Sequence, residues 1–311
     1  MGVMRMSVAY GPSNAEESVQ TLHHAYEQGI RFFDTAELYG NGHNEQLLGK
    51  AVQAYRDQII IGTKFGFDMT AEPPGSRMNS RPDNIRRVVD NSLRYLQTDY
   101  IDVLYQHIFD PEVPIEEVAG IVGELIQEGK VKYFDLSNVG ATTVRLAHAI
   151  TPVSVLQMEY SIFEREIEDR ILPTLRELGI GLVAYSPLGR GFLTGAVNPA
   201  HEYAADDFRR IDERWQGDNY TYNLHATEQL RQLADSKHIT VAQLALAWLL
   251  NQGEDIVPIP GTRNSQRLDE NIRAAKVTLT EADLQRIQDI LPHGSAGSHY
   301  PASMISNFSH D

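Results

Sequence analysis

The sequence contains no cysteine, and this absence removes several kinds of chemistry at once. Disulfide bonds, thiolate nucleophiles and cysteine-ligated zinc or iron–sulfur centres all require that side chain. Any catalytic or binding site must therefore be built from other groups.

Basic residues and long apolar runs are also scarce. The chain has 27 Lys and Arg against 42 Asp and Glu, a formal net charge of −15. Such a surface repels polyanions, so we expect neither nucleic acid nor an anionic membrane as a partner, and an anionic small ligand would need a local basic pocket. No apolar run approaches the roughly 20 residues of a membrane span, and residues 1–6 do not resemble a secretory signal. We therefore expect a cytoplasmic protein.

Short runs rich in Ile, Val, Phe and Tyr recur along the chain, each followed by a stretch with helical spacing. This alternation predicts parallel strands joined by crossover helices. Seven strands are expected, at residues 29–35, 58–65, 101–107, 131–138, 153–157, 181–186 and 255–260. Because no linker or low-complexity segment interrupts them, we predict one domain, 1–311, folded as a single (β/α)8 TIM barrel.

An eight-stranded barrel needs one more strand, and only residues 1–6 are available ahead of the first expected helix. We therefore expect a shortened first strand there. With this short strand counted as the first, the strand expected at 181–186 is the seventh. The stretch 195–222 follows it and is too long for an ordinary connection, so we predict a lid loop there. A C-terminal helix at 281–290 and a polar tail, 292–311, follow, and the tail is expected to cover the barrel mouth.

Polar residues at the C-terminal ends of barrel strands are candidate active-site residues. Asp34, Lys64 and His107 each end an expected strand, and Tyr39 follows in the next loop. Lys64 paired with Asp34 would stabilise a phenolate and make Tyr39 a usable proton donor, while His107 would polarise a carbonyl oxygen. Structural explanations stay open: a simple ion pair for Lys64 and Asp34, and a core histidine bonded to backbone groups for His107.

A phosphate site is indicated at residues 260–267, although the usual glycine-rich phosphate motifs are absent. This segment runs from the last strand into a helix, where backbone amides and the helix dipole favour an anion. Arg263 and Arg267 lie four residues apart and can reach one phosphate. The alternative is a solvated helix start with two exposed arginines.

Together these features resemble the aldo-keto reductase superfamily, and in particular its bacterial and plant branch of aldehyde reductases and pyridoxal-reductase-like enzymes. The matching segments occur in the family's order along almost the whole chain. They are FDTAELYG (33–40), GTKFG (62–66), YQH (105–107), LSN (136–138), QMEYS (157–161), AYSPLGRGFL (184–193) and PGTR (260–263).

The resemblance implies hydride transfer from NADPH to an aldehyde or ketone without a metal. Tyr39 would be the general acid/base, Lys64 and Asp34 its tuning partners, and His107 the carbonyl-orienting group. Two arginines at the adenosine 2′-phosphate favour NADPH over NADH. The implied cofactor contacts run from the nicotinamide to the adenine: Ser137, Asn138, Gln157, Tyr185, Ser186, Leu188, Gly189, Arg190, Gly261, Thr262, Arg263, Gln266, Arg267, Glu270 and Asn271.

Two alternatives to an enzyme of this kind are kept. One is a nicotinamide-binding regulatory subunit, similar to channel β subunits, with slow or single-turnover redox activity. The other is a non-redox barrel such as a lyase, which leaves the arginine pair and Tyr185 without a purpose. Neither the substrate nor the oligomeric state is indicated. We expect the pocket walls to come from Phe208, Trp215, Gln216, Tyr220, His299 and Tyr300.

The start of the sequence departs from the family pattern. Relatives usually carry a hairpin that plugs the barrel bottom and a complete first strand, whereas here residues 2–6 are all that corresponds to them. Either the start codon is assigned late, or the chain tolerates a frayed barrel edge. Arg5 also replaces a small residue that is common in relatives.

Overall fold

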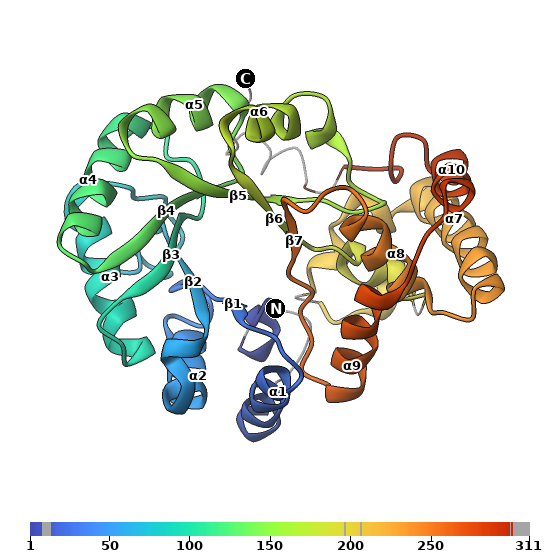
Figure 1. Ribbon diagram of the computed structural model, residues 1–311, viewed down its shortest axis with the longest axis horizontal. Coiled ribbons are helices and arrows are strands. Elements are labelled where there is room, and N and C mark those ends of the chain that lie inside the picture. The colour runs from blue at the N-terminus through green and yellow to red at the C-terminus, as the bar shows by residue number, and fades with distance from the viewer. Residues whose placement is uncertain (8–13, 196, 206, 299, 301–311) are drawn as a thin grey trace.

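A curved parallel sheet forms the centre of the protein (Figure 1). The computed structural model describes residues 1–7, 14–195, 197–205, 207–298 and 300. Seven strands follow one another in chain order, and every neighbouring pair is parallel. The strands are β1 (Phe32–Asp34), β2 (Ile60–Phe65), β3 (Ile101–Gln106), β4 (Val131–Ser137), β5 (Val153–Glu159), β6 (Gly181–Tyr185) and β7 (Ile256–Pro258).

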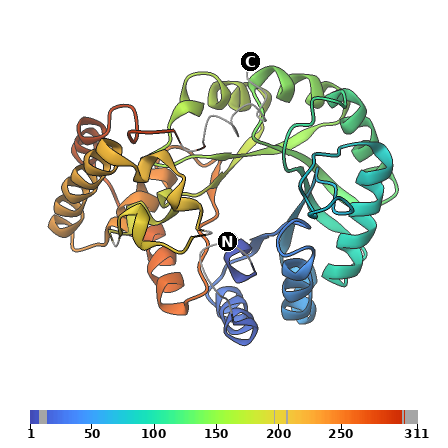
Figure 2. The same ribbon diagram turned by 180° about the vertical axis from the view of Figure 1, so that it is seen from behind.

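Helices cover the outer, convex side of this sheet, as the views from both sides show (Figure 1 and Figure 2). The arrangement follows from the crossover connections, which place a helix on the sheet surface between successive parallel strands. The helices are α1 (Ala15–Glu27), α2 (His43–Val52), α3 (Pro82–Leu96), α4 (Ile115–Gln127), α5 (Ala141–Ile150), α6 (Ile171–Leu178), α7 (Gly217–Ser236), α8 (Val241–Leu250), α9 (Ser265–Arg273) and α10 (Glu281–Ile290).

The predicted eighth strand is not present among the described residues. Met4–Met6, expected in that strand, form the 3₁₀ helix η1. Gly2 alone forms parallel bridges, one to Asp34 in β1 and one to Gly261 beyond β7. A Cβ atom on Gly2 would lie 3.0 Å from the carbonyl oxygen of Ile259, so the close approach to both sheet edges depends on the missing side chain.

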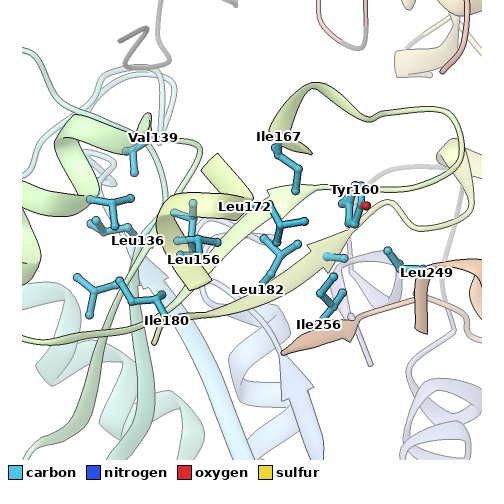
Figure 3. Close-up of a cluster of buried hydrophobic side chains, with 14 of the residues drawn as sticks. Leu136, Val139, Leu156, Tyr160, Ile167, Leu172, Ile180, Leu182, Leu249 and Ile256 are labelled. Carbon is cyan, nitrogen blue, oxygen red and sulfur yellow. The ribbon is translucent and has the colours of Figure 1, made fainter. Parts of the chain in front are cut away.

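The main core lies between the sheet and the surrounding helices. Figure 3 shows Leu136, Leu156 and Leu182 from successive strands, with Leu172 of α6 and Leu249 of α8 nearby. All five are at most 5% exposed. Because parallel strands are covered by helices, their sequences read as nearly continuous apolar runs, and each buried leucine stabilises the fold by about 1.5–3 kcal/mol.

The connection between β6 and α7 is a series of short 3₁₀ turns. These are η4 (Gly189–Thr194), η5 (Ala200–Glu202), η6 (Phe208–Arg210) and η7 (Glu213–Trp215). The side chains of Asp207 and Asp212 accept hydrogen bonds from the backbone amides of Arg209 and Arg214 and so cap η6 and η7. The predicted lid at 195–222 therefore ends earlier than expected, because α7 already begins at Gly217.

The first part of the C-terminal tail is bonded to three segments: the residues after β5, helix α7 and the turn η7. Ser295 donates from its backbone amide to the carbonyl oxygen of Phe163 at 2.8 Å, and Ala296 donates to Asn223 Oδ1 at 2.9 Å. Ser298 donates to Glu213 Oε2 at 3.1 Å. The predicted helix at 281–290 is confirmed as α10. Within the described part of the chain, no helix is both long and apolar enough to span a membrane.

Candidate active site

A buried ion pair lies at the C-terminal ends of β1 and β2. Lys64 Nζ donates to Asp34 Oδ1 at 2.5 Å and to the carbonyl oxygen of Thr35 at 2.7 Å. Lys64 is 2% exposed and Asp34 is 3% exposed. An ammonium group removed from water in this way needs an anionic partner and further acceptors, and both are supplied here.

The second oxygen of Asp34 is held from across the sheet. Gln157, on β5, donates from Nε2 to Asp34 Oδ2 at 2.7 Å. Both carboxylate oxygens are thereby fixed, which also fixes where Lys64 must point. The resemblance implied that Gln157 holds a nicotinamide carboxamide, and its side chain lines the same cavity while bonding to Asp34.

Tyr39 and His107 lie against this ion pair. Lys64 Nζ is 5.2 Å from the centre of the Tyr39 ring. The Tyr39 and His107 rings meet edge to face with 5.7 Å between their centres, and Phe67 packs on His107 in the same way at 5.4 Å. The structure therefore brings together all four residues that the strand-end pattern predicts.

Burial controls the protonation of these groups. It raises the pKa of Tyr39 well above its usual value, and the charges of Asp34 and Tyr300 act in the same direction. The expected lowering of this pKa by Lys64 is not seen, because Asp34 offsets the ammonium charge and the phenolate would be poorly solvated. Burial, followed by the charge of Lys64, lowers the pKa of His107 well below its usual value. At neutral pH, Tyr39 therefore keeps its proton and His107 is uncharged.

A cavity of about 430 Å³ opens above these residues. It reaches from Tyr39 and His107 along the ends of the later strands to the edge where Gly2 meets Gly261. Of the predicted site residues, those that line it are Asp34, Tyr39, His107, Ser137, Asn138, Gln157, Tyr185, Ser186, Leu188, Arg190 and Gly261.

A chain of hydrogen bonds runs along one wall of the cavity. Tyr185 donates from its hydroxyl to Asn138 Oδ1 at 2.9 Å, and Asn138 Nδ2 donates to Ser137 Oγ at 2.9 Å. Asn138 and Ser186 adopt positive φ angles of 56° and 48°, so the backbone turns sharply at both strand ends. Amide and hydroxyl groups fixed in this way suit a ligand that carries its own amide.

Comparison with known proteins bears on these features. Residues 1–292 match the sequence model described as the aldo/keto reductase family. The chain belongs to this family. It is 43% identical to the probable aldo-keto reductase 1 of Glycine max over 96% of the chain and 87% of that protein. It is 40% identical to the aldo-keto reductase yakc [NADP(+)] of Schizosaccharomyces pombe, over 96% of the chain and 90% of that protein.

The fold of this aldo/keto reductase is also shared with solved structures. The glycerol dehydrogenase AKR11B4 from Gluconobacter oxydans superimposes with a TM-score of 0.88 at 29% identity, covering 97% of this chain and 93% of that one. An aldo-keto reductase from Klebsiella pneumoniae, solved in complex with NADPH, gives a TM-score of 0.75 at 23% identity, with coverage of 97% and 93%.

The predicted phosphate-binding residues of this aldo/keto reductase lie around the start of α9, beyond the cavity. Asn264 caps that helix by accepting a hydrogen bond from the backbone amide of Arg267 at 3.0 Å. The side chains of Gln266 and Arg267 are exposed. Because Gly261 belongs to the cavity wall, the chain leads directly from the cavity to this helix start. The remaining predicted residues of this group are Thr262, Arg263, Glu270 and Asn271, and Glu270 accepts a hydrogen bond from Thr240.

Arg190 lines the cavity, and its guanidinium is also bound to other parts of the protein. Its guanidinium donates to Asp212 Oδ2 at 2.5 Å and to Glu159 Oε2 at 3.4 Å. The rings of Phe208 and Tyr300 lie 4.5 Å and 4.7 Å from it. The side chain thus joins the lid turns, the tail and the end of β5, and its role at a pyrophosphate stays a prediction. Gly189 precedes it and is buried outside the cavity lining.

The expected pocket walls are found only in part. Phe208 and Tyr300 line the cavity. Trp215 and Tyr220 instead pack on Phe192, at ring-centre distances of 4.7 Å and 5.9 Å. Gln216, also expected in the wall, donates to the carbonyl oxygen of Arg210. His299 lies outside the described residues.

Some cavity residues were not predicted. Gly2, Met4 and Arg5 line the cavity because the segment expected to form a strand turns into η1 instead. Leu38 and Thr194 also face it. The unusual arginine at position 5 was the one signal in the sequence that pointed to this wall.

Proposed function

We propose that this chain is an NADPH-dependent carbonyl reductase that converts aldehydes or ketones to alcohols, with Tyr39 as the general acid. One observation carries the proposal: the buried Lys64–Asp34 pair lies directly against Tyr39 at the floor of a cavity, next to an uncharged His107. A structural ion pair alone would need neither the tyrosine nor the cavity.

The residues present fit a nicotinamide dinucleotide phosphate. The Ser137–Asn138–Tyr185 chain offers partners for a carboxamide, and α9 offers a helix start with Arg263 and Arg267 for a phosphate. Two similar proteins support the same cofactor. The name of the Schizosaccharomyces pombe relative includes NADP(+), and the Klebsiella pneumoniae protein was solved in complex with NADPH. When bound, the cofactor supplies the hydride from C4 of its nicotinamide ring.

The side chains of this protein supply the rest of the chemistry. His107 is neutral and can present a ring N–H to the substrate carbonyl oxygen, which polarises the C=O bond. Tyr39 holds a proton on its hydroxyl and gives it to the same oxygen as the alcohol forms. The phenolate that remains lies beside the Lys64 ammonium, whose position Asp34 and Thr35 fix.

The test is the decay of NADPH absorbance with purified protein and a panel of carbonyl compounds, including pyridoxal, methylglyoxal and a nitrobenzaldehyde. We expect sustained turnover, faster with NADPH than with NADH. Tyr39→Phe should lower kcat by about 100- to 10,000-fold, the usual contribution of a positioned general acid.

NADPH binding to Tyr39→Phe, followed by fluorescence, is the control and should match the wild type. Full turnover in Tyr39→Phe would contradict the proposed mechanism. Cofactor binding without multiple turnovers in the wild type would instead indicate the regulatory-subunit alternative, in which bound NADPH is oxidised once and slowly.

A further inference from the structure

Tyr105 lies below the Lys64 ammonium, outside the cavity. It is the register partner of Lys64 across β2 and β3, so both side chains are on the same face of the sheet. Its ring centre is 5.5 Å from Lys64 Nζ, and the ring centre of Tyr39 is 5.2 Å from the same atom. The Lys64 ammonium therefore lies near two tyrosine rings, of which Tyr39 lines the cavity and Tyr105 does not.

The space that Tyr105 occupies is created by Gly62. This residue precedes Lys64 by two positions and so faces the same side of β2. A Cβ atom at position 62 would lie 3.0 Å from Tyr105 Cε2 and 3.3 Å from an edge carbon of Phe32. Even a methyl group there would be too close to the ring of Tyr105, which would have to shift by a few tenths of an ångström beside Lys64.

The ring of Tyr105 remains neutral and has its aromatic face available to a cation. The residue is fully buried, and burial together with the charges of Asp34 and Asp135 raises its pKa well above the usual value. Its hydroxyl has no partner within hydrogen-bonding geometry among the described residues, although the nearby Gln157 side chain acts on this pKa in the opposite direction. The contact of Tyr105 with the ion pair is therefore made by its ring, beside Lys64 Nζ.

We propose that Tyr105 is a positioning residue for Lys64: its ring, seated in the space left by Gly62, holds the ammonium against Asp34 and beside Tyr39. Asp34 and Thr35 bind the ammonium through two hydrogen bonds, and the ring of Tyr105 lies beside the same group. A cation–π contact in a desolvated interior adds to these bonds and favours the charged form. The inference rests on the proposed function, in which Lys64 serves Tyr39.

Two substitutions separate the ring from the hydroxyl. Tyr105→Phe keeps the ring, and its kcat should stay within about threefold of the wild type, since the cation–π contact remains and Gln157 keeps its hydrogen bond to Asp34. Tyr105→Leu removes the ring, and kcat should fall by about 10- to 100-fold, the cost of a small misplacement of a catalytic group. KM for NADPH should change little, because Tyr105 does not line the cavity.

The pH profile gives a readout that loss of packing alone would not move. Without the ring, the ammonium of Lys64 is held less firmly beside Tyr39, so the Tyr39 phenolate is less stabilised and the pKa of Tyr39 rises further. The alkaline limb of kcat/KM, which reports loss of the Tyr39 proton, should therefore move to higher pH in Tyr105→Leu and stay in place in Tyr105→Phe. Gly62→Ala, which leaves Tyr105 intact but displaces its ring, should reproduce the direction of both changes. Gly62→Ala also tests the proposal if Tyr105→Leu does not fold.

Tyr160→Leu is the matched control. Tyr160 is also a buried tyrosine, 1% exposed, but it packs on Trp248 far from the ion pair. Its loss should lower stability and leave kcat and the pH profile unchanged. The inference is overturned if Tyr105→Leu or Gly62→Ala keeps wild-type kcat and pH profile, or if Tyr105→Phe is as impaired as Tyr105→Leu. Absence of carbonyl reduction in the wild type would instead contradict the proposed function.

Discussion

Asp135 shows how one residue can make stability depend on pH. The register between β4 and β5 shifts next to it, which leaves two backbone amides of β5 without strand partners. Asp135 Oδ1 accepts from both, Ser154 at 3.1 Å and Val155 at 2.6 Å. Its second oxygen, Oδ2, has no partner among the described residues. Burial outweighs the two hydrogen bonds and raises the pKa of Asp135 to about 8.

We expect stability to fall as the pH rises from about 4 to about 8. In the unfolded chain this carboxyl group ionises near its reference pKa of about 3.9, whereas the folded protein keeps it protonated up to about 8. Between these two pH values the folded state therefore binds more protons than the unfolded state. The contribution of Asp135 to the free energy of unfolding is complete below about pH 4 and decreases as the pH rises to about 8. Urea unfolding midpoints measured at intervals over this pH range should show the decline.

Asp135→Asn should reduce this decline, because an amide cannot ionise but still offers Oδ1 to Ser154 and Val155. Burial raises the pKa of Glu45 to about 7, so this residue also lowers stability as the pH rises. Glu45→Gln should therefore remove a separate part of the decline. Asp57→Asn, at an exposed carboxyl, should leave the slope unchanged. An unaltered pH slope in Asp135→Asn would show that burial does not hold this group neutral.

The sequence predicts which residues form the site better than it predicts their contacts. Asp34, Lys64 and His107 could be selected because strand ends are recognisable from apolar runs, and parallel strands bring their ends together. The bond from Gln157 to Asp34 crosses the sheet over 123 positions in sequence, and no local pattern reports it. Tyr105 was overlooked for a similar reason: an aromatic residue within a strand looks like ordinary core.

At the scale of elements, the lid turns are held by buried charges. Arg214 of η7 is fully buried and donates to Glu159 at the end of β5 and to Glu164, both at 2.7 Å. Arg190 and Asp212 extend this network toward the cavity. The turns contain little regular hydrogen bonding of their own, so these ion pairs determine where the lid lies.

We expect Arg214→Met to destabilise the protein by about 3–5 kcal/mol, because two buried carboxylates lose their partner. Methionine preserves most of the volume, so the loss reports the charge. The free energy of unfolding in urea is the measurement. Arg145→Met is the matched control: Arg145 pairs with Glu177 on the surface, and its removal should leave stability nearly unchanged. Equal effects of the two substitutions would contradict the anchoring role.

Helices and strands were predicted correctly where apolar residues recur at a regular spacing, and incorrectly where that spacing is interrupted. All seven expected strands occur, although β1 and β7 have only three residues each and are shorter than the expected 29–35 and 255–260. The lid was expected to reach residue 222, but α7 begins at Gly217. Gly217, Asp218 and Asn219 are poor helix formers, so the sequence does not mark this helix start. In η1, three residues are too few to show any period, so a strand and a 3₁₀ turn look alike in sequence.

For the whole molecule, the main question is how the curved sheet joins its two edges. Among the described residues, Gly2 forms bridges to both strand β1 and the segment after β7. On the β1 side, hydrogen bonds of 2.9 Å also join Val3 to Asp34 and Asp34 to Met1. Helix α1 adds a further link, since Thr21 Oγ1 donates to the carbonyl oxygen of Arg263 at 3.1 Å. Gly2 and Gly261 also line the cavity. The junction that holds the sheet edges together is thus part of the cavity wall, so we expect stability and cofactor binding to be coupled.

We expect Gly2→Val to weaken both properties. The new Cβ atom would meet the carbonyl oxygen of Ile259 at 3.0 Å, a backbone atom that can yield only if the junction opens. Overpacking of this kind costs about 1–3 kcal/mol, and the dissociation constant of NADPH should rise because the cavity wall moves. Gly120→Val is the matched control, since a side chain there meets nothing within 4 Å and α4 tolerates valine at least as well as glycine. Urea unfolding and NADPH fluorescence titration measure the two effects. If Gly2→Val lowered stability and left NADPH affinity intact, the junction would support the sheet without shaping the site; the shared wall argues that both must change together.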